Sequence, residues 1–147
     1  MRLEYTAEEI IKHHLITEWR KEEGKPYEQI NEVHKTFEEI KGIDDGYLDE
    51  LMENFRCEGG ESTGIKTDEQ NYEVEVRAIK FSDGWIGWYH LHGGGKHSEP
   101  TLYPWLEKAF FLNVADEKEI ITIERTFERS IKAKMPLSIL QGEKYLG

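Results

Sequence analysis

The sequence is poor in cysteine and in long apolar runs. It has one cysteine, Cys57, and no run of 18 or more apolar residues among its 147 positions. A single cysteine excludes a framework of intrachain disulfides and is typical of a reducing compartment. Without a long apolar run we expect no membrane span. The first residues, Met1-Arg2-Leu3-Glu4, turn acidic at once and lack the apolar core of a signal peptide. The sequence therefore predicts a soluble cytoplasmic protein with a single domain.

Basic residues are also scarce. Nineteen Lys and Arg stand against thirty Asp and Glu, which gives a formal net charge of -11. Residues 1–60 carry eight basic and sixteen acidic side chains, whereas residues 129–147 are net basic. This balance argues against direct binding of nucleic acid, because such binding depends on neutralising phosphates. It fits either a plain solvated surface or a surface that competes with nucleic acid for a basic partner.

Three amphipathic helices are predicted in the first sixty residues. Thr6 and Glu9 have the spacing of a capping box, which marks the start of the first helix. A second pattern of apolar residues at three- and four-residue steps covers about 27–41, and a third covers about 44–58. The apolar stripe of the first helix recurs at four-residue steps: Ile11, Leu15 and Trp19.

After residue 58 the spacing of apolar residues along the chain changes. Residues 58–71 have almost no apolar content, which predicts a flexible connection. Apolar and charged residues alternate over 72–78, as in a strand, and Ser82-Asp83-Gly84 is typical of a hairpin turn. An aromatic return strand is expected from Trp85 to about His92. A helix is expected after it, from about Thr101, with this apolar stripe: Leu102, Trp105, Leu106, Ala109 and Phe110.

A last strand is expected from Glu119 to Glu128, followed by an irregular tail with a turn of helix around Leu137–Leu140. The predicted fold class is α+β, with N-terminal amphipathic helices followed by a small antiparallel sheet in ββαβ order. Its parts are a helical part, a flexible connection, a ββαβ part and a tail: 1–57, 58–71, 72–129 and 130–147. One face of such a sheet needs cover, either from the helices or from a second copy of the chain.

The segment from Trp85 to Pro100 concentrates the residue types that carry chemistry. In one interpretation it binds an anion or a nucleotide, because a glycine run lets backbone amides approach a ligand and a following helix start adds partial positive charge. The spacing of a Walker A loop and the dinucleotide fingerprint are both absent. The candidate binding residues are the glycine run, the next two residues and two stacking aromatics: Gly93, Gly94, Gly95, Lys96, His97, Trp88 and Tyr89.

Two other interpretations of this segment stay open. A metal-dependent hydrolase would use His90 and His92 on one strand face, His97 folded back across the glycines, and Glu99 as a base. In the third interpretation the glycines are a mobile connection and the aromatic residues belong to a core or a sheet edge. We expect no cofactor. Cys57 is expected to be an inert thiol.

From Trp85 through Arg129 the chain resembles small uncharacterised proteins encoded by bacteriophages and prophages. The shared pattern is an aromatic strand that enters Gly93–Pro100, an aromatic-rich helix, and a charged strand that ends at Arg125-Thr126-Phe127. The resemblance covers about a third of the chain. It implies a bacterial cytoplasm and an accessory factor that binds a host enzyme, a defence protein or a signalling nucleotide, and it brings no catalytic residue.

The leading hypothesis is a non-catalytic protein that binds a host or phage protein. Acidic helices, an aromatic hairpin that looks exposed, and the lack of a coherent catalytic set motivate it. A homo-oligomer is left open, and no membrane or direct nucleic-acid partner is expected. The alternatives are the anion or nucleotide binder and the metal-dependent hydrolase described above.

Overall fold

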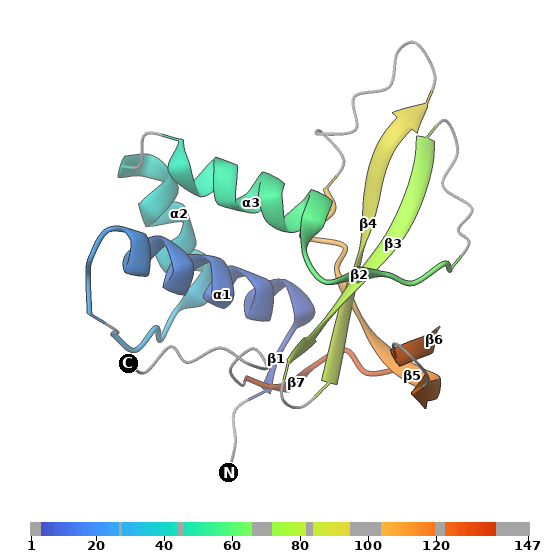
Figure 1. Cartoon of the computed structure of the whole chain (residues 1–147). Coiled ribbons are helices and arrows are strands. Elements are labelled where there is room, and N and C mark those ends of the chain that lie inside the picture. Colours follow the sequence, from blue (N-terminus) through green and yellow to red (C-terminus); the bar gives the residue numbers. More distant parts are fainter. Residues whose placement is uncertain are drawn as a thin grey trace.

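The fold is α+β, as predicted. In the described part of the chain, three helices precede a five-stranded antiparallel sheet of order β2-β3-β4-β5-β6, and a two-stranded sheet joins β1 to β7 (Figure 1). The computed structural model describes residues 4–26, 28–43, 46–65, 72–81, 84–94, 104–119 and 123–137. The elements are β1 Glu4–Tyr5, α1 Ala7–Glu22, α2 Val33–Ile43, α3 Tyr47–Glu58, β2 Glu61–Ser62, β3 Tyr72–Phe81, β4 Gly84–Gly94, β5 Phe110–Glu119, β6 Ile123–Arg129 and β7 Met135–Pro136.

Helix α1 begins where the capping box predicts. The Glu9 amide donates to Thr6 Oγ1 at 3.2 Å, and the Thr6 amide donates to Glu9 Oε1 at 2.9 Å. The helix is buried on more than its apolar stripe, because α2, α3 and the sheet all pack against it. Ten of its side chains are buried, among them Lys12, His13 and His14. No helix in the described ranges is both long and apolar enough to cross a membrane.

Helix α2 starts later than predicted. It begins at Val33, whereas the apolar pattern suggested a start near Tyr27, which lies outside the described residues. Ile30 is buried although its backbone is not helical. Ile30 is three residues before Val33, so its burial continues the apolar spacing of α2 although the segment that carries it is irregular. Helix α3 agrees with its prediction over nearly its whole length.

The predicted flexible connection contains a short strand. Glu61 and Ser62 form β2 and pair with Ala78 and Arg77 of β3, while residues 66–71 lie outside the described part. Gly60 makes this pairing possible, because a Cβ at this position would lie 1.9 Å from the Ala78 carbonyl oxygen. The tail is not wholly irregular either. Met135 pairs with Tyr5, and the predicted turn at Leu137–Leu140 lies almost entirely outside the described residues.

The predicted ββαβ order is wrong. Residues 105–108 form a turn, and the chain then enters strand β5 at Phe110, while Thr101 and Leu102 lie outside the described residues. Phe110, Phe111 and Leu112 are all buried because both faces of the sheet are covered at this point. A continuous apolar run is typical of such a strand. The predicted last strand, 119–128, spans the end of β5 and most of β6.

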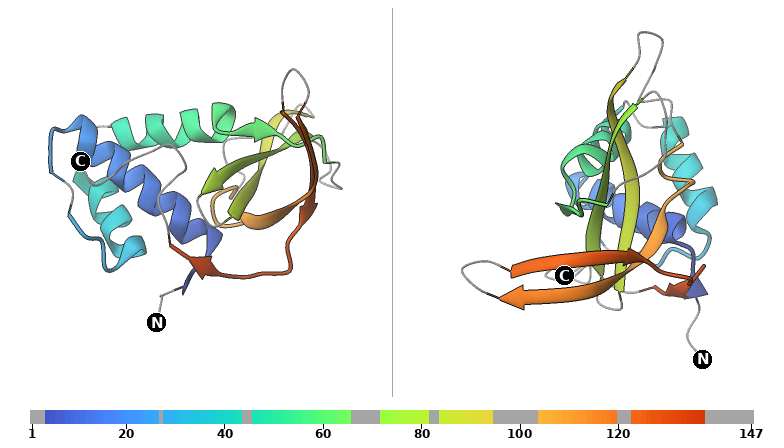
Figure 2. Two further views of the ribbon diagram at one scale, coloured as in Figure 1. Left: turned by 60° about the horizontal axis from the view of Figure 1, so that its bottom comes forward. Right: turned by 90° about the vertical axis from the view of Figure 1, so that its right-hand side faces the viewer.

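The sheet is curled, and the helices lie on one side of it (Figure 2). Each face of the sheet carries its own core. The face toward the helices contributes four residues to the main core: Phe81, Ile86, Trp88 and Phe111. The opposite, concave face holds a smaller cluster: Val76, Ala78, Trp85, Phe110, Leu112 and Phe127. Trp85 and Trp88 are therefore buried on opposite faces, and the expectation of an exposed aromatic hairpin is corrected. The helices provide the cover that the sheet needs on one face.

Candidate functional site

The glycine run begins inside strand β4. Gly93 pairs with Glu73 and Gly94 with Tyr72, while Val74 pairs with Leu91. Strand β4 thus has one extra residue at this point, and such bulges bend a strand and redirect its side chains. Gly95, Lys96, His97 and Glu99 lie outside the described residues. The proposed anion loop therefore stays a prediction.

The two predicted stacking residues lie on opposite faces of the sheet. The Trp88 ring is fully buried, and its indole N–H donates to the Arg56 carbonyl oxygen at 3.0 Å. The ring also packs on Phe55, with 4.7 Å between the ring centroids. Tyr89 is half-buried on the concave face beside Phe110. Trp88 is a core residue, and the two rings do not form one surface for a base.

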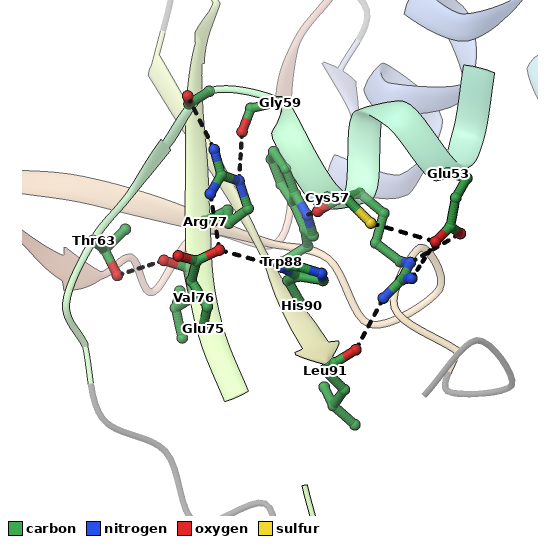
Figure 3. A network of polar contacts seen from close by, with 12 residues as sticks. Glu53, Cys57, Gly59, Thr63, Glu75, Val76, Arg77, Trp88, His90 and Leu91 are labelled. Carbon is green, nitrogen blue, oxygen red and sulfur yellow. Dashed lines mark hydrogen bonds and ion pairs between the residues drawn. The ribbon is translucent and has the colours of Figure 1, made fainter. Parts of the chain in front are cut away.

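His90 belongs to a polar network at the end of β4 (Figure 3). Its Nδ1 lies 3.2 Å from Glu75 Oε1, and the Arg77 guanidinium donates to the same oxygen at 2.8 Å. Burial opposes ionisation of Glu75, but the hydrogen bonds from Arg77 and His90 outweigh it and lower the Glu75 pKa to about 2. Arg77 also donates to the carbonyl oxygens of Gly59 and Gly60. Arg77 therefore links the segment between α3 and β2 to strand β3 of the sheet.

Arg56 makes a second tie between α3 and β4. Its buried guanidinium donates to both oxygens of Glu53 and to the Leu91 carbonyl oxygen at 3.1 Å. The Cys57 thiol lies 3.3 Å from Glu53 Oε1. Burial raises the Cys57 pKa most, and the hydrogen bond to the Glu53 carboxylate raises it further. A raised pKa favours the unreactive thiol form. The guanidiniums are thus used to hold the fold rather than to present charge to a ligand.

The three candidate metal ligands are not seen together. His90 contacts a carboxylate, the His92 side chain and His97 lie outside what the structure describes, and the described residues contain no group of three metal-ligating side chains. What the arrangement offers is a histidine oriented by a carboxylate, next to a bulge and a glycine run. This geometry is compatible with anion binding but supplies no activated nucleophile among the described residues.

A second site lies between α1 and α3, which run in roughly opposite directions (Figures 1 and 2). We call it the α1–α3 groove; its volume is about 300 Å³. Leu15, Leu51 and Phe55 form its apolar floor; Leu15 and Phe55 are buried in the main core, and Leu51 is half-buried. The remaining lining residues are polar or small: His14, Glu18, Asn54, Glu58 and Gly59. An apolar floor with a polar rim is the usual anatomy of a protein interface.

The groove lies in a region of negative charge. Tyr47 is at the start of α3, and its pKa is raised by burial and then by the surrounding carboxylates: Glu22, Glu50, Glu18 and Glu23. Glu58 adds a carboxylate near the end of the same helix. The only base among the lining residues is His14. Burial, followed by the charges of His13 and Lys21, lowers the His14 pKa to about 4, so it is neutral at pH 7.

Sequence reasoning missed this groove. The acidic excess of residues 1–60 was visible, but the side chains that line the groove come from two helices about 40 residues apart in the chain. Their meeting depends on how α1 and α3 pack. The sequence pattern alone assigned these glutamates to solvated helix faces.

The concave face has its own cavity, of about 380 Å³, between β2, β3, β4 and β6. Arg125 lies over the Trp85 ring at 4.8 Å and forms ion pairs with Glu61 at 2.7 Å and Glu117 at 2.8 Å. Its charge is thus neutralised by carboxylates of β2 and β5. This arrangement closes the curled sheet across its open side.

Comparisons with models of protein families, with curated proteins and with solved structures found no match. Function is therefore inferred from the arrangement of the described residues.

Proposed function

We propose that this protein binds another protein, from a bacterial host or a phage, without catalysing a reaction. The α1–α3 groove carries this proposal, because it combines a partly open apolar floor with carboxylates around it. Residues at the centre of a protein interface are desolvated and apolar, while charged residues at the rim set orientation and association rate. The net charge of -11 supports a partner of opposite sign.

The described polar groups support binding better than catalysis. The Cys57 pKa is raised, so this thiol is not arranged as an activated nucleophile. Arg56 and Arg77 are held by carbonyl and carboxylate oxygens of the fold itself.

A pair of charge-reversal variants tests the proposal. The groove variant carries Glu58→Lys, at a residue that lines the groove, and Glu50→Lys, one helical turn before the lining residue Asn54. The control variant carries Glu38→Lys and Glu39→Lys on α2. All four glutamates are exposed and helical, and both variants change the net charge equally. A partner captured from a bacterial lysate by the tagged protein should be lost with the groove variant and retained with the control variant. Equal retention by both variants would refute the groove as the binding surface.

Binding of an anion or a nucleotide at the end of β4 is the second candidate. The bulge next to Gly93, together with the oriented His90, favours it over the metal-dependent hydrolase. If this candidate is right, a nucleotide should raise the melting temperature of the protein, and Lys96→Ala with His97→Ala should abolish the increase. A shift that survives both substitutions would exclude this segment as the site.

A further inference from the structure

The α1–α3 groove has a shape and a charge that select one kind of occupant. The part of α3 that lines the groove, 51–58, has eight residues, which corresponds to about 12 Å at 1.5 Å per residue. Along this length the floor offers Leu15, Leu51 and Phe55. A segment that covers the floor therefore needs apolar side chains along about two helical turns.

The backbone of the groove walls excludes an occupant that binds as an added β-strand. A peptide that binds as a β-strand needs the free N–H and C=O groups of a sheet edge. The walls of this groove are helices, whose interior backbone groups are already paired within each helix. A third helix fits between two helices by placing its side-chain ridges into the groove that they form. The walls thus favour an α-helix as the occupant.

The carboxylates define the charge of that helix. Glu18 of α1 and Glu58 of α3 line the groove, so each wall carries a carboxylate. Glu22 and Glu50 lie four residues from the lining residues Glu18 and Asn54, which places them on the same helix faces, next to the groove. Lys21, which forms an ion pair with Glu18 at 3.7 Å, is half-exposed and is not among the residues that line the groove. A helix with acidic flanks would be repelled, and a helix with basic flanks would pair with both walls.

We propose that the α1–α3 groove binds an amphipathic α-helix of a partner protein, with lysine or arginine on both sides of its apolar stripe. This inference rests on the proposed function, since it names the partner segment for the same site. The apolar stripe covers Leu15, Leu51 and Phe55, and the basic flanks lie against the carboxylates of α1 and α3.

A fluorescent peptide of about 14 residues, made only of leucine and lysine with leucines at three- and four-residue steps, tests this directly. One control peptide has the same composition in an order without an apolar stripe, and another has glutamate in place of lysine. Anisotropy should show that the first peptide binds the natural protein and that the other two do not. Binding should weaken several-fold when NaCl is raised from about 50 mM to about 300 mM.

The charge-reversal variants locate the binding. Replacing Glu50 and Glu58 with Lys should weaken peptide binding about tenfold or more, while replacing Glu38 and Glu39 should change it less than about threefold. Backbone amide NMR signals of α1 and α3 should shift on binding, and those of β5 and β6 should stay. Equal weakening by both variants, or binding of the glutamate peptide, would overturn the inference.

The two proposals fail in different ways. If a captured partner depends on the groove but the leucine–lysine peptide does not bind there, the proposed function stands and the helical basic occupant is wrong. If neither the partner nor the peptide is affected by the groove variant, both are wrong.

Discussion

The buried histidines of α1 predict that acid destabilises the fold. Burial, followed by the charge of Arg20, lowers the His13 pKa from 6.5 to about 4, and burial lowers that of His14 equally. His14 lies between α3 and β3, with ring centroids 5.6 Å from Phe55 and 6.4 Å from Phe81. Between pH 6.5 and pH 4 the unfolded chain therefore binds more protons at these residues than the folded chain does. By linkage, stability is full above about pH 6.5 and falls as the pH drops toward 4.

The magnitude follows from the two pKa values. At pH 5 each histidine costs about 2 kcal/mol of unfolding free energy relative to pH 7.5, at 1.36 kcal/mol per pKa unit. Glu75 acts in a lower range. Its folded pKa is about 2, so its contribution is present above about pH 4.5 and is lost only below that. Glu75 therefore contributes almost no change in stability between pH 7.5 and pH 5.

Urea unfolding followed by tryptophan fluorescence at pH 7.5 and pH 5 measures this loss. The natural protein should lose a few kcal/mol over this interval, and the double variant His13→Gln, His14→Leu should lose markedly less. His34→Gln serves as the control, because the side chain of His34 is half-exposed, and it should keep the natural dependence. An unfolding free energy that stays constant or rises toward pH 5 would refute the reasoning, as would a double variant with the natural slope.

Three further predictions concern stability and use the same urea assay at pH 7.5. Trp88→Ala should cost about 3–5 kcal/mol, because a fully buried ring and its hydrogen bond to Arg56 are lost; a loss below about 1 kcal/mol would contradict its place in the core. Gly60→Ala should destabilise the fold far more than Gly24→Ala. Both glycines have a positive φ, 59° at Gly60 and 73° at Gly24. Of the two, only Gly60 would bring a Cβ against the backbone, 1.9 Å from the Ala78 carbonyl oxygen. Similar losses in the two variants would disprove the close approach of β2 to β3. Thr6→Ala should cost about 1 kcal/mol through loss of the capping box, whereas Thr6→Ser should cost little; equal losses would show that the cap does not stabilise α1.

Features set by neighbouring residues were predictable from the sequence. The Thr6–Glu9 capping box needs only residues three apart, and it is present as predicted. The β3–β4 hairpin follows from alternation on both sides of a short turn, and it is present, although Gly84, predicted in the turn, already pairs with Phe81 as the first residue of β4. The acidic character of residues 1–60 likewise needed only counting.

Features that depend on residues far apart in the sequence could not be predicted from it. The spacing of Trp105, Leu106 and Phe110 suits a helix, yet Phe110 pairs with Gly87 across the sheet and the chain is a strand. At Gly87 a Cβ would lie 2.9 Å from the Phe110 ring, so the missing side chain there lets β5 approach. The groove depends in the same way on contacts between α1 and α3. Periodicity within one segment does not report which other segment covers it.

Site-specific photocrosslinking tests whether the α1–α3 groove is the surface that binds a partner. A photoreactive phenylalanine replaces either the exposed Asn54, which lines the α1–α3 groove, or the exposed Thr126 on β6. After irradiation in a bacterial lysate, the Asn54 protein should give a discrete adduct with one partner, and the Thr126 protein should give none. An adduct that forms from Thr126 and not from Asn54 would place the binding surface on the sheet and not in the α1–α3 groove.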